Sequence, residues 1–216
     1  MIPQKFSKKE AISFGWQTMK DNFWFFVVLL TIIALIIAMP EIILHFVKDI
    51  LVLVIFINIV SVILSLIIDL GLYKISLKFY DKEKVKLSDL FACWPLLFKY
   101  LIATILYILI VTGGSILLIV PGIIWGIKYQ FYGYLIVDKG LRPIAALKKS
   151  GQITKGAKWN LFLLGLLFAG ITILGILILI IGLFAALPTI LIASAFVYRK
   201  LLAFSKVPEI SSEVSV

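Results

Sequence analysis

Cysteine, histidine and acidic residues are scarce in this sequence. Its one cysteine, Cys93, can form no disulfide within the chain and cannot build a cysteine-rich metal site. Its one histidine, His45, has one glutamate nearby, Glu41, which makes a poor metal site, and the sequence contains no HExxH pattern and no paired-carboxylate motif. The glycines lie within apolar runs, which does not fit a phosphate-binding loop. These absences predict a protein that is not an enzyme and that binds no cofactor and no metal.

Charge of either sign is also sparse. Charged residues make up 15% of the chain and hydrophobic residues 62%, against about 25% and roughly 45–50% in soluble domains. A chain of 216 residues cannot bury that much apolar surface in a soluble fold, so we expect an integral membrane protein. The formal net charge of +10 would suggest a nucleic-acid partner for a soluble protein. In a membrane protein, basic residues beside the spans set the orientation instead, so no nucleic-acid partner is expected.

The apolar residues fall into runs long enough to cross a bilayer, which takes about 20 helical residues. Residues 23–39 and 50–68 each fit one crossing. Residues 101–137 contain one charge, Lys128, and residues 161–198 contain none. Each of these longer runs would extend roughly 55 Å as a helix, which is two crossings. The prediction is an all-α, polytopic membrane helix bundle of six spans in three hairpins, with turns at Pro121-Gly122 and near Gly182: 22–39, 50–72, 100–120, 122–138, 160–181 and 183–202.

Basic residues are distributed unevenly around these six spans. All Lys and Arg residues except Lys48 and Lys128 fall on the side that holds both termini. Because lysine and arginine are retained on the cytoplasmic side of membrane proteins, both termini are expected in the cytoplasm. The expected location is the plasma membrane, as a multi-pass protein of the bacterial inner-membrane type.

A basic, amphipathic segment precedes each expected hairpin. In the first, Ser7 and Glu10 can form a capping box at a helix start. The second is interrupted at Pro95, and in the third Pro143 suits the first helical turn. We interpret these segments as interfacial helices that open three similar units, 7–80, 87–139 and 142–203, within one transmembrane domain of residues 1–216. Residues 206–216 are expected to form a flexible tail. The alternative is three amphipathic linkers that merely look alike.

Three stretches resemble a known family: "DLGLYKISLKFYDKEKVKLSDLF", "LIVPGIIWGIKYQFYGYLIVDKG" and "ALKKSGQITKGAKWNLFLLGLL". They are similar to an uncharacterised family of bacterial six-span membrane proteins, related to the membrane domain of some glycerophosphoryl diester phosphodiesterases. The resemblance covers residues 69–201 and supports the six-span topology, but it implies no activity. It is most specific at these positions: Pro121, Gly122, Ile123, Asp138, Ser150, Lys155, Gly156 and Trp159.

Polar residues inside membrane spans are candidate functional residues, because they are costly to bury. The candidates here are Lys128, Gln130, Asp69 and Asn58. Asp69 is expected at the cytoplasmic boundary of the second span. Lys128 is expected near the outer turn, where its long side chain can reach the outer interface. A contact inside the bundle and a transport role are the alternatives for Lys128.

Glycines and aromatic residues cluster in the expected fourth span. Gly122, Gly126 and Gly133 would share one helix face, which allows close packing against another helix in the same bundle or in a second copy. Gly113, Gly114 and Ser115 could supply the matching surface. Tyr132 and Tyr134 are expected at the inner membrane interface, where tyrosine is common.

Two functions remain open at this point. The first is a non-enzymatic membrane protein that binds membrane lipids, anionic ones among them, or a protein partner or a second copy of the chain. The alternative is a small transporter or channel-like subunit with a polar path near Lys128. Candidate interfacial or lipid-facing residues are Trp16, Trp24, Trp94, Lys148, Lys149, Lys155, Lys158 and Trp159.

Overall fold

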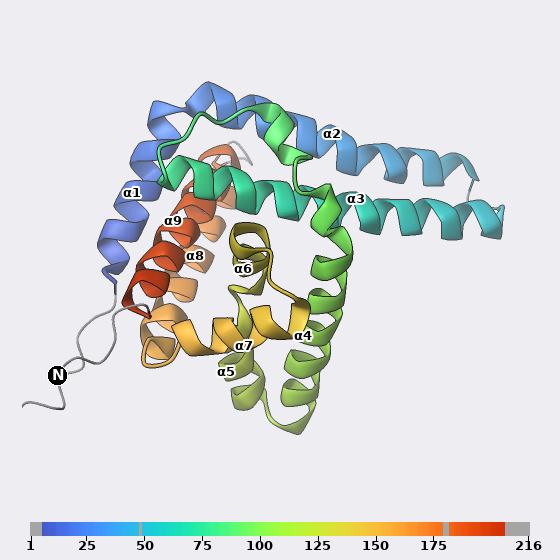
Figure 1. The fold of residues 1–216 in the computed structure, drawn as a ribbon. Helices are drawn as coiled ribbons and strands as arrows, with labels where there is room; N and C mark the ends of the chain where they lie inside the picture. Colours follow the sequence, from blue (N-terminus) through green and yellow to red (C-terminus); the bar gives the residue numbers. More distant parts are fainter. Residues whose placement is uncertain (1–5, 48, 179–181, 206–216) are drawn as a thin grey trace, which may run out of the picture.

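The computed structural model describes residues 6–47, 49–178 and 182–205, and all regular structure in these ranges is helical. The expected tail at 206–216 lies outside them. Two short 3₁₀ helices, Leu87–Leu90 and Trp94–Leu96, separate the third and fourth α-helices (Figure 1). The α-helices in these ranges are α1 (Lys8–Asp21), α2 (Phe23–Val47), α3 (Leu51–Tyr80), α4 (Leu97–Leu117), α5 (Ile119–Tyr129), α6 (Tyr132–Lys139), α7 (Pro143–Ile153), α8 (Lys158–Leu177) and α9 (Leu183–Phe204).

Five helical segments of the described residues are long and apolar enough to cross a membrane. They are α2, α3, the segment Leu87–Leu117 that ends with α4, α8 and α9. The remaining expected span, the fourth at residues 122–138, is divided between the two shorter helices α5 and α6. The sequence therefore located the long apolar helices, but it did not indicate that the fourth span is broken.

The α2–α3 pair forms the first hairpin and extends away from the other helices (Figure 1). Helix α2 continues through Pro40 to Val47, so the expected end at residue 39 is wrong. Proline is tolerated inside membrane helices because neighbouring groups can satisfy the freed carbonyl. Near the tip of this hairpin, Phe46 is 79% exposed and Leu51 is 71% exposed. Large apolar side chains this exposed suit a hydrocarbon environment.

The turn between α4 and α5 is a single extended residue, Leu118, with φ −162° and ψ 141°. The expected turn at Pro121-Gly122 is therefore wrong by three positions. Pro121 instead lies in the first turn of α5, where the N–H that proline lacks would have no partner within the helix. The apolar residues around Leu118 are highly exposed, from Ile116 at 80% to Val120 at 65%. This end of the hairpin also has the character of a membrane-embedded segment.

Helices α5 and α6 together lead the chain back along α4. Halfway along, the Thr104 and Tyr132 hydroxyls are 2.9 Å apart. At the far end, the Lys99 ammonium donates a hydrogen bond to the Gly140 carbonyl oxygen at 3.1 Å. The end of α6 therefore lies beside the start of α4, and the two short helices together match the length of that longer helix.

The segments that precede the hairpins differ from one another. Helix α1 begins as expected, because the Glu10 N–H donates to the Ser7 hydroxyl at 3.3 Å. Helix α7 begins at Pro143, also as expected. The second segment, however, forms only the two 3₁₀ helices, so the expectation of an interfacial α-helix there is wrong. Pro95 lies inside the second of these helices, and proline cannot donate a hydrogen bond within a longer helix.

Helix α1 packs tightly against α9, the most deeply buried of the long helices. A Cβ added at Gly15 would clash with the Thr189 carbonyl oxygen, so only glycine allows the two backbones to come this close. Trp16, the next residue, points away and is 48% exposed. Helix α8 ends at Leu177 and α9 begins at Leu183, and the expected turn near Gly182 falls largely on residues 179–181, which lie outside the described ranges.

Tyrosines fill the centre of the molecule. Tyr132 and Tyr134 are 6% and 4% exposed, so their rings pack inside the protein, and their expected depth at the inner membrane interface stays a prediction. Tyr132 stacks on Tyr100 with a ring-centroid distance of 5.6 Å. Tyr134 lies between Tyr73 and Tyr198, with ring-centroid distances of 4.5 and 5.2 Å. These rings join α3, α4, α6 and α9 into one core.

Candidate functional site

The four polar residues expected inside the spans do not share one cavity. Lys128 lines a groove beside α7, whereas Gln130 lines a separate cavity between α2, α3 and α9. Asn58 lies on the exposed surface of α3 and donates to a carbonyl of its own helix. Asp69 accepts a hydrogen bond from the Tyr100 hydroxyl at 3.3 Å. The structure therefore does not bring these four residues together at one site.

The candidate residues that do come together form a groove of about 540 Å³ between α4, α5 and α7, called the lysine groove below. Lys128 comes from α5, Lys148 from α7, and Lys155 from the turn that follows α7. Gln152 adds a neutral polar group. Apolar side chains of α4 and α7 complete the groove: Leu106, Ile110, Ile144 and Leu147. Cations beside an apolar surface suit an anionic amphiphile, with its phosphate at the ammonium groups and its hydrocarbon on the aliphatic side chains.

Lys128 lies far from the outer turn, contrary to expectation. It is ten residues after Leu118, which places it about 15 Å along the helix from the turn. Its side chain lies beside α7, where a Cβ added at Gly151 would be 3.0 Å from Lys128 Cε. Its ammonium lies 4.7 Å from the centre of the Tyr129 ring. The lysine side chain therefore extends towards the basic α7 helix.

The break between α5 and α6 is held by hydroxyl groups of α7. Ser150 Oγ accepts a hydrogen bond from the buried N–H of Phe131 at 3.2 Å and lies 3.0 Å from the Lys128 carbonyl oxygen, to which it donates. Thr154 Oγ1 also lies 3.0 Å from that carbonyl oxygen. Backbone groups freed by a broken helix need such partners away from water. Ser150 and Thr154 thus tie the lysine-bearing helix α7 to the broken helix.

This arrangement gives a physical reason for part of the family-like segment that runs from Ser150 to Trp159. The serine is fully buried, and its hydroxyl forms hydrogen bonds with backbone groups at the break between α5 and α6. Gly156 has φ +80°, a conformation that favours glycine, in the turn that leads into α8. The role of Thr154 was missed, because a threonine four residues after a serine is unremarkable in sequence.

A second polar cluster joins the ends of α3, α6 and α9. The Arg199 guanidinium pairs with Asp81 just after α3, and with Asp138 on α6 at 2.9 Å. Tyr198 donates to the same Asp138 carboxylate at 2.8 Å, and Lys139 lies 3.2 Å from it. Arginine suits this position because its planar fork can serve two carboxylates at once. Asp138 belongs to the family-like pattern, but its partners come from distant parts of the chain and were missed.

The three candidate packing glycines do not face one common helix: Gly122 and Gly126 face α4, whereas Gly133 faces α3. A Cβ added at Gly122 would clash with Ser115 on α4, which was the expected partner surface. Gly126 faces the Tyr107 hydroxyl, which donates to its carbonyl oxygen at 3.3 Å. Gly133 lies on α6, across the break, where an added Cβ would clash with the Tyr73 ring. The expectation of one continuous glycine face is therefore wrong, because the helix is broken between Gly126 and Gly133.

The candidate interfacial tryptophans are all exposed, from Trp16 at 48% to Trp24 at 77%, with Trp94 and Trp159 between. Trp159 and Lys158 line an apolar cleft of about 310 Å³ between α5 and α8. Lys149 is half-buried and does not line the lysine groove. Lipid contact by these residues stays a prediction.

Within the described ranges, no group of three or more His, Cys, Asp or Glu side chains lies close enough together to hold a metal ion. His45 lies near the tip of the α2–α3 hairpin, where its ring packs edge-on against Phe46 at 5.8 Å. Cys93 is buried as a free thiol. The residues that meet in the lysine groove are mainly cationic and apolar.

The fold and the site together define an all-helical protein with several helices of membrane-spanning length and a cationic groove. Residues 99–205 match the model of a family described as "Protein of unknown function (DUF975)". The match runs from the start of α4 to the end of α9, so it includes the lysine groove, the helix break and Arg199. Searches of curated proteins and of solved structures found no match. The match to a family of unknown function confirms the expected similarity to an uncharacterised family. The relation to the phosphodiesterase membrane domain and the bacterial origin stay predictions.

Proposed function

We propose that this is a non-enzymatic, multi-pass membrane protein that binds anionic lipid in the lysine groove. The observation that carries the proposal is the meeting of Lys128, Lys148 and Lys155 beside an aliphatic surface. Each lysine near a membrane surface contributes about 1 kcal/mol of attraction to anionic lipid. Three such lysines give about 3 kcal/mol, which is roughly a hundredfold preference for anionic over neutral headgroups.

The proposal includes six membrane crossings. Helices α5 and α6 form the fourth crossing together, a reading supported by the contact between Lys99 and Gly140 at its far end. The ends of α3, α6 and α9 then lie on one side, which is supported by the cluster of Asp81, Asp138 and Arg199. The excess of basic residues on this side makes it cytoplasmic, with both termini there, in a plasma membrane.

The test measures lipid binding to the full chain in neutral detergent micelles. Phosphatidylglycerol and phosphatidylcholine are titrated separately, and bound lipids are counted by native mass spectrometry. Replacing Lys148 and Lys155 together by glutamine should weaken phosphatidylglycerol binding about 30-fold, because roughly 2 kcal/mol of attraction is lost. Phosphatidylcholine binding should not change.

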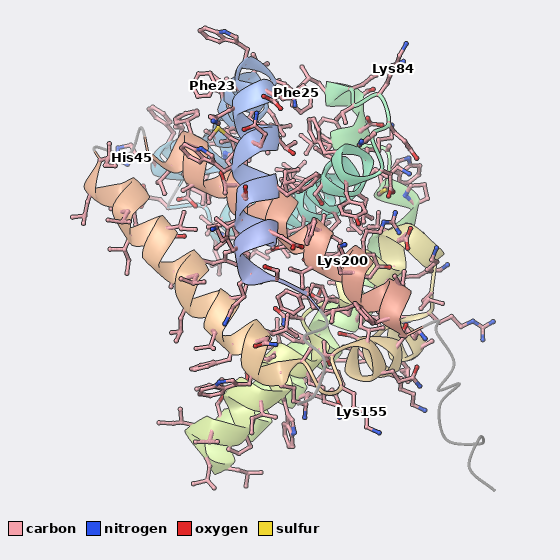
Figure 2. The ribbon with its side chains drawn as sticks, turned by 90° about the vertical axis from the view of Figure 1, so that its left-hand side faces the viewer. Phe23, Phe25, His45, Lys84, Lys155 and Lys200 are labelled. Atoms are coloured by element: carbon pink, nitrogen blue, oxygen red, sulfur yellow. The ribbon has the colours of Figure 1, made fainter. Side chains whose placement is uncertain are left out.

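The matched control replaces Lys84 and Lys200 by glutamine, which removes the same net charge. Neither residue lines the groove, and Lys84 lies far from Lys155 (Figure 2). This control should bind phosphatidylglycerol like the natural protein. If both double variants lose the same affinity, overall charge attracts the lipid and the groove does not.

A small transporter or channel-like subunit is the second candidate function. The observation in its favour is the broken α5–α6 segment, because interrupted helices are common at transporter binding sites. In that case Lys128→Met should abolish flux through the purified protein in liposomes. Undiminished flux in this variant would count against a path through Lys128.

A further inference from the structure

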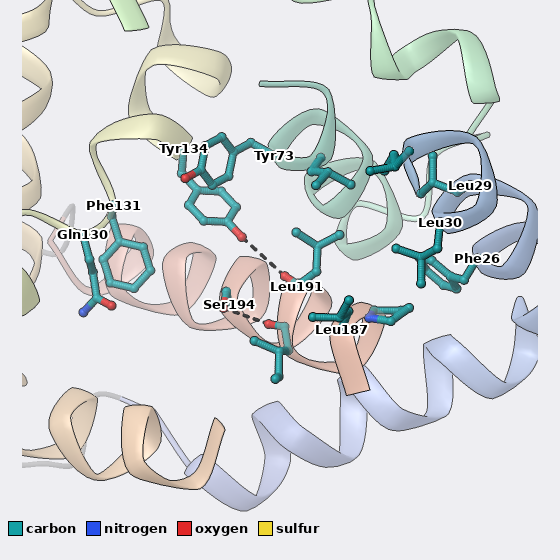
Figure 3. Close-up of a pocket in the computed structure, with 14 residues that line it drawn as sticks. Phe26, Leu29, Leu30, Tyr73, Gln130, Phe131, Tyr134, Leu187, Leu191 and Ser194 are labelled. Carbon is teal, nitrogen blue, oxygen red and sulfur yellow. Dashed lines mark hydrogen bonds between the residues drawn. The ribbon is translucent and has the colours of Figure 1, made fainter. Parts of the chain in front are cut away.

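A cavity of about 430 Å³ lies between α2, α3, α6 and α9 (Figure 3), and Gln130 and Phe131 of the helix break belong to its lining. Its size falls within the range of about 300–1,000 Å³ that is typical of small-molecule sites. Gln130, in the break itself, lines this cavity, whereas Lys128 lines the groove. The two sites therefore share the broken helix but no lining residue.

None of the 14 residues around this cavity is Asp, Glu, Lys, Arg or His. Moving a phosphate or carboxylate from water into such a place is costly, because nothing in the lining offsets its charge. The lysine groove, with three ammonium groups, has the opposite character. The ligand that fits the cavity is uncharged.

Polar groups are concentrated at one end of the cavity. Figure 3 shows Gln130, Tyr73 and Tyr134 on one side, and Phe26 and Leu30 of α2 on the opposite side. The Tyr134 hydroxyl donates to a carbonyl oxygen of α9 at 3.3 Å, and the Gln130 amide nitrogen donates to its own helix at 3.0 Å. The cavity therefore matches a molecule with a hydrogen-bonding head and an apolar tail.

The apolar end of the cavity is formed by a helix of membrane-spanning length, α2. Leu29 and Ile33 of this helix are buried at the cavity, while Leu35 further along the same helix is 61% exposed. A ligand whose tail lies against α2 can enter sideways from the hydrocarbon layer of the bilayer. This placement indicates a membrane lipid and not a water-soluble metabolite.

We propose that the cavity binds an uncharged membrane amphiphile, a lipid with a hydroxyl or ester head and hydrocarbon chains. The head lies at Gln130 and Tyr73, and a chain lies along Leu29, Leu30 and Ile33 of α2. The protein then has two lipid sites at one broken helix, one for an anionic lipid and one for a neutral lipid. This second site is independent of the function proposed above.

The test titrates 1,2-dioleoylglycerol, as the neutral probe, against the full chain in detergent micelles and counts bound molecules by native mass spectrometry. Leu30→Trp fills the apolar end and should weaken binding at least tenfold. Leu35→Trp, the matched control on the exposed surface of α2, should leave binding unchanged. Gln130→Leu, at an exposed position where folding is not at risk, should weaken binding about three- to tenfold by removing a hydrogen bond.

Phosphatidylglycerol titrated against the same variants separates the two sites. Leu30→Trp should leave its binding unchanged, and the double glutamine variant at Lys148 and Lys155 should leave dioleoylglycerol binding unchanged. Dioleoylglycerol binding that does not saturate, or that survives both Leu30→Trp and Gln130→Leu, would overturn the neutral-lipid site while leaving the lysine groove standing. A change from dimer to monomer in Leu30→Trp alone would show that a second copy fills the cavity, which also overturns it.

Discussion

Removing the hydroxyls of Ser150 and Thr154 should lower the free energy of unfolding. The loss should be larger for Ser150 than for Thr154, and the two losses should not be additive. Ser150→Ala leaves the buried N–H of Phe131 without its partner, which costs about 1–3 kcal/mol. Thr154→Val keeps the shape of the side chain, and the Lys128 carbonyl can still accept a hydrogen bond from Ser150. We therefore expect Thr154→Val to cost only about 0.5 kcal/mol.

The double variant should cost more than the sum of the two single variants. The single Thr154 hydroxyl proton is shared among the carbonyl oxygens of Lys128, Ser150 and Gly151, and Ser150 donates to the Lys128 carbonyl oxygen. With both hydroxyls gone, neither side chain can donate to that carbonyl oxygen. The expected coupling free energy is about 1 kcal/mol. The free energy of unfolding can be measured by titrating SDS into the protein in mixed micelles.

Thr172→Val on α8 is the matched control, because its hydroxyl donates only to a carbonyl of the same helix. It should cost no more than about 0.5 kcal/mol. If the coupling between Ser150 and Thr154 is zero within error, or Ser150→Ala is as mild as the control, then α7 does not hold the broken helix through these hydroxyls.

Three further predictions concern close packing and the Arg199 cluster. Gly122→Ala should cost about 1–3 kcal/mol, because its methyl group would clash with Ser115, while Gly165→Ala, where nothing lies within 4 Å, should be neutral or slightly stabilising. Arg199→Met should cost about 2–3 kcal/mol, because two carboxylates lose their shared partner in a mostly buried site. Arg199→Lys should recover less than half of that loss, since one ammonium cannot replace the planar fork of the guanidinium. The control Lys200→Met should lower the free energy of unfolding only slightly. SDS titration measures all of these changes, and equal stability of the Arg199 and Lys200 variants would contradict the role given to the cluster.

The long helices could be predicted from sequence because the length of an apolar run is a physical requirement for crossing a bilayer. Local chemistry also located the start of α1 at Ser7 and the start of α7 at Pro143. These features depend on residues close together in sequence. Capping and proline geometry act over a single turn, so the pattern carries enough information.

Proline was a poor guide to the helix ends within the apolar runs. Pro40 lies inside α2, and Pro121 lies inside the first turn of α5. In a membrane, tertiary neighbours can satisfy the carbonyl that proline leaves free, so proline need not end a helix. The position of the α4–α5 turn at Leu118 is associated with the close approach of Gly122 to Ser115, which the sequence does not reveal.

The contacts between distant residues around the candidate site could not be predicted from the sequence, for a different reason. Arg199 meets Asp81 across 118 positions, and Ser150 meets Phe131 in the break between α5 and α6. No periodic pattern within either segment encodes such a pair. The direction of Lys128 was missed likewise, because it depends on α7 folding back against α5.

The central claim is that the three hairpins share one end, with α5 and α6 together completing the second hairpin. Single cysteines introduced in a Cys93→Ser background test it, with a membrane-impermeant maleimide added to intact cells or to inverted vesicles. Cysteines in place of Lys84 and Arg142 should react only in inverted vesicles, while a cysteine in place of Asp49 should react only in intact cells. Reaction of the cysteine at position 142 from the same side as position 49 would contradict the account, because α5 and α6 would then not cross the membrane.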